Sequence, residues 1–158
     1  MIANEYHFIT KWRITGTVDE VTEILSDAPS LVRWWPTVYL DVRELEPGDS
    51  NGVGRVIALH TRGWLPYTLK WQFRVTEVRS PYGFSLRAWG DFDGRGVWTF
   101  QQDGKYVDIT YDWKISAEKP LLRYLSFILK PVFAANHRWA MACGEESLKQ
   151  ELTRRRSQ

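Results

Sequence analysis

The chain has 158 residues with a net charge of +2 at pH 7, and 44% of its residues are hydrophobic and 25% charged. These values are typical of one globular domain with a sizeable core, so we expect a single domain over residues 1–158, and the balanced charge argues against a nucleic-acid partner. Aromatic residues make up 15% of the chain and include nine tryptophans, an excess that either fills a thick core or lines a cavity with flat apolar walls.

The first part of the chain predicts a strand followed by two short helices. Residues 6–15 alternate between apolar and polar side chains, as in a strand with one buried face. Thr17 and Glu20 have the spacing of a capping box, which opens a helix, and a second helical turn runs over residues 28–35 before Pro36 ends it. The strand is not preceded by a basic and apolar secretion signal, so we expect a cytoplasmic location.

The middle of the chain predicts six more strands in an antiparallel meander. Short segments rich in Gly, Pro, Asp and Asn separate apolar runs, which is typical of strands joined by tight turns. We expect strands at 38–45, 53–61, 67–78, 84–89, 95–101 and 106–115, with a turn at 91–94. Since neighbouring side chains of a strand point to opposite faces, the aromatic and aliphatic residues should gather on one face of the sheet.

The segment 119–156 predicts a long helix that this apolar face of the sheet covers. Apolar residues recur at steps of three and four, which stacks them on one side of a helix: Leu121, Leu125, Ile128, Val132, Ala135, Trp139 and Cys143. We expect this stripe to be buried, with Trp139 packed against inward-facing aromatics of the sheet. The interior partners predicted for it are Trp98, Tyr111 and Trp113.

Three further features of this segment bear on its structure. Pro131 removes a backbone hydrogen bond and should divide the segment into a short helix at 121–129 and a long one at 132–154. The apolar run 121–133 is too short and too charged for a membrane span, so no stable membrane insertion is expected. Cys143 is the only cysteine, which excludes an internal disulfide and a multi-cysteine metal site.

The order of elements, the turn Trp34-Trp35-Pro36, the hairpin at 63–67 and the turn at 91–96 resemble the helix-grip superfamily of START-like, pollen-allergen-like and polyketide cyclase/dehydrase proteins (SRPBCC), in particular its bacterial cyclase-type members. The resemblance covers the whole chain. It implies an α+β fold in which a seven-stranded curved antiparallel sheet wraps around a long C-terminal helix. It also implies a hydrophobic cavity between sheet and helix that holds a lipid, polyketide, quinone or similar molecule.

The candidate ligand-binding residues are aromatic side chains of the inward sheet face and of the loops, with one amide and one tryptophan from the last helix. They are Trp12, Trp35, Trp64, Trp71, Phe73, Trp98, Tyr111, Trp113, Asn136 and Trp139. Asn136 lies within the apolar stripe, where it is either a satisfied core amide or a polar anchor at the cavity floor. His137 falls away from the stripe and should be exposed or at the rim.

The sequence contains no recognisable catalytic motif, and the superfamily shares none, so the catalytic residues stay unknown. The three histidines, at 7, 60 and 137, have no metal-ligand spacing, and neither a metal nor a cofactor is expected. Charged residues at the expected cavity mouth are Arg33, Asp91, Asp93 and Arg95. Two functions remain: a carrier or binding protein for an apolar small molecule, and a cofactor-independent cyclase, aromatase or dehydratase that uses the same cavity. A third possibility is a fully packed domain with no cavity. The oligomeric state and the ligand are left open.

Overall fold

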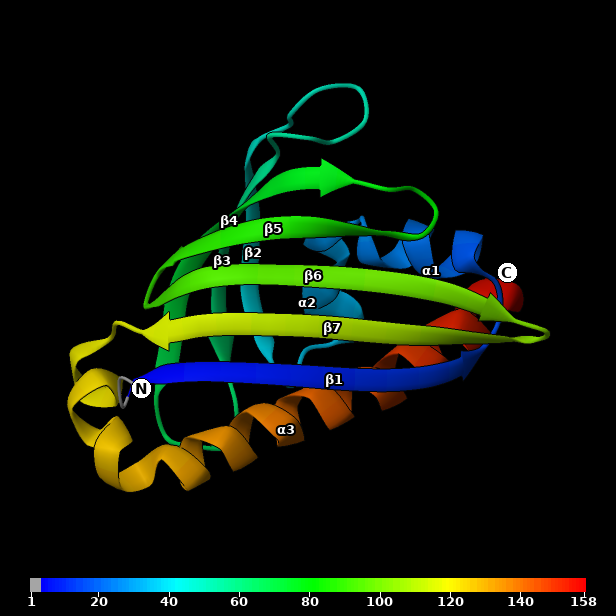
Figure 1. The fold of residues 1–158 in the computed structure, drawn as a ribbon. Coiled ribbons are helices and arrows are strands. Elements are labelled where there is room, and N and C mark those ends of the chain that lie inside the picture. The colour runs from blue at the N-terminus through cyan, green and yellow to red at the C-terminus, as the bar shows by residue number, and fades with distance from the viewer. Residues whose placement is uncertain (1–3) are drawn as a thin grey trace.

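The computed structural model describes residues 4–158, and they form the predicted α+β helix-grip architecture (Figure 1). The strands are β1 (Glu5–Thr15), β2 (Tyr39–Glu46), β3 (Val56–Arg62), β4 (Thr68–Val78), β5 (Gly83–Gly90), β6 (Phe92–Asp103) and β7 (Tyr106–Ala117). The helices are α1 (Val18–Leu25), the 3-10 turn η1 (Ala28–Ser30), α2 (Leu31–Trp34) and α3 (Pro120–Arg156). The described helices include none with the length and hydropathy needed to cross a membrane.

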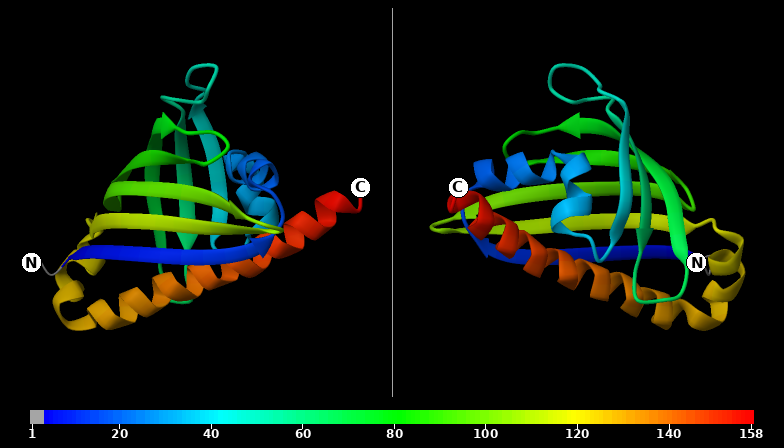
Figure 2. Two further views of the ribbon diagram at one scale, coloured as in Figure 1. Left: turned by 45° about the vertical axis from the view of Figure 1, so that its right-hand side comes forward. Right: turned by 180° about the vertical axis from the view of Figure 1, so that it is seen from behind.

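One curved antiparallel sheet contains all seven strands in the order β1-β7-β6-β5-β4-β3-β2. The strand meander therefore places β1 beside β7 and leaves β1 and β2 at the two edges. Figure 2 shows that α1, α2 and α3 all lie on one side of the sheet, with α3 running along β1. The space enclosed by the sheet and α3 contains the core, as predicted.

The first helix begins where the sequence predicts it. The Thr17 hydroxyl accepts a hydrogen bond from the backbone N–H of Glu20 at 3.2 Å, and the Glu20 carboxylate accepts one from the N–H of Thr17 at 3.0 Å. This capping box satisfies two amide groups that would otherwise be unpaired at the helix start. The helix buries Val21, Ile24 and Leu25 against the sheet core.

Alternation along the strands correctly predicts which face of the sheet is buried. On β7 the five residues assigned inward are all buried: Val107, Ile109, Tyr111, Trp113 and Ile115. Trp98 of β6 pairs with Tyr111 in the sheet register, and their rings stack with centroids 4.1 Å apart. Tyr111 also stacks on Trp113 of the same strand, with ring centroids 5.5 Å apart, so stacked aromatic rings form part of the concave face.

The turn predicted at residues 91–94 is wrong, because β6 already begins at Phe92. Gly94 is a strand residue that pairs with Ile115, and a Cβ atom there would lie 2.1 Å from the Lys114 carbonyl oxygen. A glycine is needed at this position because two strands approach closely, and not because the chain turns. Only Asp91 separates β5 from β6, and its carboxylate accepts a hydrogen bond from the Lys70 amide of β4 at 2.7 Å.

The predicted division of the last helix at Pro131 is also wrong. A single helix runs from Pro120 to Arg156 with Pro131 inside it. Figure 1 shows that the first turns of α3, drawn in yellow, run in a different direction from the long orange and red portion. A proline inside a helix removes one backbone hydrogen bond and favours a bend, and here the helix bends without ending.

The face of α3 that packs against the sheet differs from the predicted apolar stripe. The fully buried residues are Leu122, Ser126, Asn136, Met141, Gly144, Leu148, Glu151 and Leu152. Trp139 instead has 37% of its surface exposed and does not reach the interior aromatics. Gly144 must be small because a large ring already fills the space beside it: a Cβ atom there would lie 2.3 Å from the ring of Trp35, the residue that follows α2.

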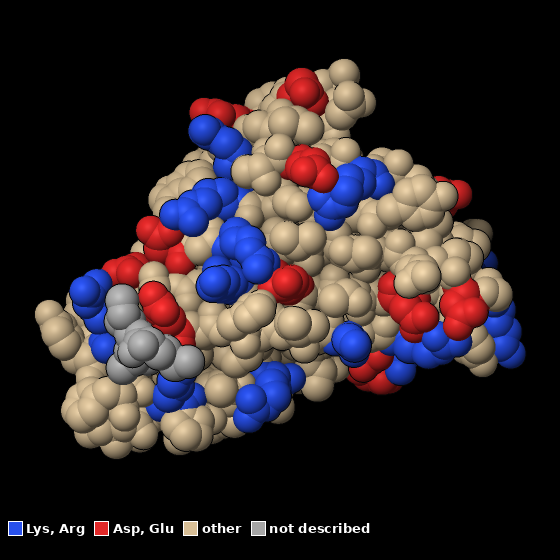
Figure 3. Space-filling model, viewed as in Figure 1, with Lys and Arg blue, Asp and Glu red and all other residues tan. Residues whose placement is uncertain are grey.

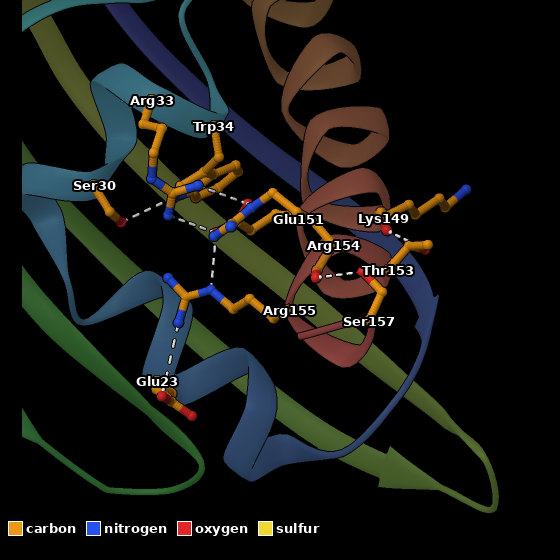
Figure 4. A network of polar contacts seen from close by, with 10 residues as sticks. All are labelled: Glu23, Ser30, Arg33, Trp34, Lys149, Glu151, Thr153, Arg154, Arg155 and Ser157. Carbon is orange, nitrogen blue, oxygen red and sulfur yellow. Dashed lines mark hydrogen bonds and ion pairs between the residues drawn. The ribbon is translucent and has the colours of Figure 1, made fainter.

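A buried carboxylate joins the end of α3 to α2. The Glu151 side chain is 2% exposed and accepts two hydrogen bonds from Arg33 of α2, at 3.0 and 2.7 Å. Arg154 and Arg155 of the same helix also donate to it (Figure 4). Hydrogen bonds from Arg154, Arg33 and Arg155 hold the pKa of Glu151 well below its ordinary value.

Candidate ligand cavity and its polar groups

A cavity of about 110 Å³ lies between the concave face of the sheet and α3. The sheet supplies Trp71, Tyr111 and Trp113 to its wall, while α3 supplies Phe133 and His137. Most of the remaining lining is apolar, and one lining residue, Arg62, is exposed. Arg62 is the last residue of β3 and precedes the loop to β4, which Figure 2 shows reaching α3, so the cavity meets the surface beside this loop.

The structure brings five of the ten candidate residues together around this cavity: Trp35, Trp71, Tyr111, Trp113 and Asn136. Two others, Trp12 and Trp98, are buried in the aromatic core behind the lining, where Trp12 contacts both Trp35 and Trp98. These two therefore support the wall without forming part of it.

The remaining three candidates lie away from the cavity. Phe73 lines a separate hollow of about 400 Å³ between the end of α1, the 47–55 loop and β4. Trp64 is 49% exposed on the β3–β4 loop, and Trp139 lies on the outer side of α3. Sequence alternation could not separate Phe73 from Trp71 because both belong to the same face of one curved strand.

Asn136 holds the β3–β4 loop against α3. Its side-chain oxygen accepts hydrogen bonds from the backbone amides of Trp64 at 2.8 Å and Leu65 at 3.3 Å. Gly63 allows this approach, because a Cβ atom at that position would lie 2.1 Å from the same oxygen. The amide is therefore satisfied by a loop rather than by a strand, and it also lines the cavity.

His137 is a cavity residue, contrary to the expectation that it is exposed or at the rim. Its ring stacks on Phe8 with centroids 4.1 Å apart, and Nε2 is buried with no hydrogen-bond partner among residues 4–158. Burial, and to a smaller extent the nearby Arg138, lowers the pKa of His137 to about 4. The imidazole is thus neutral at pH 7 and retains one nitrogen able to bond a further group.

Several tyrosines and one tryptophan of the same wall carry hydrogen-bonding groups. Burial raises the pKa of Tyr39 and of Tyr111 well above the ordinary value, so both hydroxyls stay protonated at neutral pH. Trp35 Nε1 is buried without a hydrogen-bond partner in the described part of the chain. Burial also raises the pKa of Tyr67 to about 12, partly offset by a hydrogen bond with Asn136.

The charged residues expected at the cavity mouth are engaged elsewhere. Arg33 pairs with Glu151, Asp93 with Arg87 and Arg95 with Asp112, while the carboxylate of Asp91 accepts a bond from the Lys70 amide. The lining within residues 4–158 contains no Asp or Glu, and these residues hold no group of three His, Cys, Asp or Glu side chains arranged to bind a metal ion. His137 is therefore the one lining residue with a side chain that titrates below neutral pH.

The burial of His137 predicts a pH dependence of stability. A histidine whose folded pKa lies near 4 and whose unfolded pKa lies near 6.5 binds its proton more readily in the unfolded chain. The free energy of unfolding should therefore fall by up to about 3 kcal/mol as pH drops from about 6.5 to 4. Urea denaturation of wild type and His137→Phe across this range measures the effect; an equal slope in both proteins would contradict it.

Comparisons with known proteins identify the fold but no family. Neither the family models nor the curated proteins contain a match to this chain. Among solved structures, a protein from Thermus thermophilus matches with a TM-score of 0.76 at 11% identity, covering 94% of this chain and 97% of that one. An aromatase/cyclase from Streptomyces sp. R1128 matches with a TM-score of 0.72 at 17% identity, covering 96% and 95% of the two chains.

A STAR-related lipid transfer protein from Xanthomonas axonopodis gives a TM-score of 0.59 at 16% identity over 93% of this chain and 85% of that one. These identities are low, so the similarity concerns architecture rather than activity. Each of the three nevertheless covers nearly the whole chain. Together with the sheet order and the long C-terminal helix, they show that this chain has the helix-grip fold of the START-like and aromatase/cyclase structures.

Proposed function

We propose that the protein binds an apolar small molecule that carries an oxygen acceptor, in the cavity between the sheet and α3. The observation that supports this is a cavity walled by aromatic rings, two of whose lining residues carry a buried nitrogen without a partner in the described chain: Trp35 at Nε1 and His137 at Nε2. A buried polar group without a partner costs about 1–3 kcal/mol. A ligand oxygen that accepts from Trp35 would remove this cost, and this is how a few polar groups orient a ligand in an apolar site.

The volume of the cavity limits the ligand. An apolar cavity of about 150 Å³ holds one benzene ring, so about 110 Å³ accommodates a small part of a larger molecule in the closed form. A lipid, quinone or polyketide would require the β3–β4 loop or the first turns of α3 to move outward. The Asn136 hydrogen bonds to Trp64 and Leu65 are the contacts that such a movement would break.

The lining favours binding over catalysis. A general base needs a pKa near the working pH, whereas the pKa of His137 is lowered to about 4. The described lining also supplies no carboxylate to stabilise a protonated imidazole. The cyclase alternative draws support from the fold shared with an aromatase/cyclase and from the position of His137 on the cavity wall, and the experiment below separates the two functions.

Filling the cavity should abolish ligand binding. Ala140 lines the cavity, while Ala142 is exposed two residues later on the same helix. We expect Ala140→Phe to weaken binding of the neutral fluorophore 1-aminoanthracene at least about tenfold, because the added ring occupies the space that the ligand needs. Ala142→Phe, the matched control, should bind as wild type does. Fluorescence titration measures both.

Equal affinities in the two variants, or binding of the fluorophore that does not saturate, would contradict the proposal. Native mass spectrometry of the purified protein then tests for a co-purified small molecule. Incubation with poly-β-ketone substrates addresses the alternative: a product that forms with wild type but not with His137→Phe would establish the cyclase function instead.

A further inference from the structure

The first turns of α3 expose a group of large apolar side chains to solvent. Tyr124, Phe127 and Ile128 have 70%, 72% and 62% of their surface exposed, and Leu121 and Val132 extend the group along the helix. We call these five residues the α3 apolar surface. Single exposed apolar residues are ordinary, but a contiguous group on one helix marks a surface that contacts something other than water.

The charged side chains of this part of α3 are mostly basic. Residues 118–144 contain four basic side chains and one acidic side chain, whereas the last part of α3 carries both signs. The acidic residue, Glu118, pairs with Arg123, and the Lys119 ammonium lies 3.9 Å from a carboxylate of the sheet. Residues 118–144 therefore carry a net positive charge. Figure 3 shows the corresponding lower left of the molecule as largely uncharged, with Lys and Arg beside it and Asp and Glu along its upper border.

This combination matches the boundary of an anionic lipid bilayer. Aromatic and aliphatic side chains enter the headgroup region while neighbouring lysines and arginines interact with negative lipid headgroups. Tyr and Trp are favoured at that depth because each has an apolar body and a polar end. Trp64, which is 49% exposed and bonded through its amide to Asn136 of α3, adds a further aromatic ring on the neighbouring loop.

The α3 apolar surface adjoins the cavity. Leu122 and Phe133 belong to the same stretch of α3 as Tyr124 and Ile128, but their side chains line the cavity. The helix therefore has one face toward the cavity and the opposite face toward solvent. A bilayer contacting the outer face would lie next to the loop at which the cavity meets the surface.

We propose that the α3 apolar surface, together with Trp64, docks the protein onto anionic lipid membranes as a peripheral, reversible contact. The docking goes beyond ligand binding and does not require it, because none of the five residues of the α3 apolar surface lines the cavity. Its positive flank makes the contact depend on anionic lipid and on ionic strength, and its apolar side chains make the contact depend on insertion.

Vesicle co-sedimentation tests the docking directly. Wild type is mixed with vesicles of phosphatidylcholine alone and of phosphatidylcholine with phosphatidylserine, at low and high salt. We expect binding to the anionic vesicles that weakens at high salt, and a decrease of about tenfold or more in the double variant Phe127→Ser/Ile128→Ser. Leu45→Ser/Tyr82→Ser, which removes two exposed apolar side chains from β2 and the β4–β5 turn, should bind as wild type does.

Circular dichroism melting of both double variants checks that they fold, which surface substitutions should permit. The proposal is overturned by absence of wild-type binding to either vesicle, or by an equal loss in the two double variants. It is also overturned if sedimentation analysis finds a dimer that only Phe127→Ser/Ile128→Ser dissociates while vesicles fail to bind, since the surface would then contact a second copy. Loss of 1-aminoanthracene binding in Ala140→Phe tests the cavity separately and leaves the docking result unaffected.

Discussion

Replacing Trp35 with alanine is expected to lower the free energy of unfolding by about 3–5 kcal/mol. The side chain is 1% exposed and contacts the rings of Trp12, Trp34 and Tyr39 as well as the backbone of α3 at Gly144. Its removal leaves a void where α2, β2 and α3 meet, and a rigid backbone cannot close that void. Urea denaturation at pH 7 measures the loss.

Trp139→Ala is the matched control for this prediction. It deletes the same number of atoms from α3, but 37% of the Trp139 surface is already in contact with water. We expect it to cost less than about half as much, since the transfer free energy scales with the apolar area withdrawn from solvent. A larger loss for Trp139→Ala than for Trp35→Ala would mean that the helix packs through the apolar stripe and not through Gly144.

Replacing Glu151 with alanine is expected to lower the free energy of unfolding by about 3 kcal/mol at pH 7. The substitution leaves Arg33, Arg154 and Arg155 facing one another without the carboxylate that bridges them. These arginines are partly exposed, so water can solvate their charges after the carboxylate is removed. The loss of stability should therefore lie at the lower end of the range for breaking a buried ion pair. Glu146→Ala, an exposed position on the same helix, should change stability by less than about 0.5 kcal/mol.

The Glu151 contribution also has a defined pH dependence. Its pKa is lowered in the folded protein, so the stabilisation is present above the unfolded value near 4.5 and is lost as pH falls below it. The difference in stability between wild type and Glu151→Ala should therefore shrink in that acidic range. This acidic range begins near the pH at which the effect of His137 ends. A stability difference between wild type and Glu151→Ala that stays constant down to about pH 3 would contradict the prediction.

The sheet could be predicted from the sequence because the alternation that assigns side chains to its two faces depends only on neighbouring residues of each strand. Alternation with period two fixes the face of every residue on β7, and the inward placement of Tyr111 and Trp113 on the cavity wall follows from it. The exception is the start of β6. Gly94 resembles a turn residue in sequence, yet the structure needs it because two strands approach closely there.

The packing face of α3 could not be predicted because it depends on what the sheet already fills. Apolar residues lie on two faces of α3, so either face could pack against the sheet. Hydrophobicity alone favours the face that contains Trp139 and Ile128. The interior instead receives Gly144 and Ser126, because Trp35, which follows α2, and Tyr6 of β1 reach into the same space. The same change of face brings His137 to the cavity, which no spacing rule in the sequence indicated.

The hydrogen bonds that Asn136 accepts from the β3–β4 loop have a kinetic consequence. Two such bonds contribute about 1 kcal/mol each, which corresponds to roughly thirty closed molecules for each open one. A molecule that reaches the cavity past this loop must wait for the rare open form both to enter and to leave. For an occupant that is bound with the loop closed, the two bonds therefore lengthen arrival time and residence time by the same factor and leave the equilibrium affinity unchanged. For a larger occupant that holds the loop open, the same bonds lower the affinity, because binding must break them.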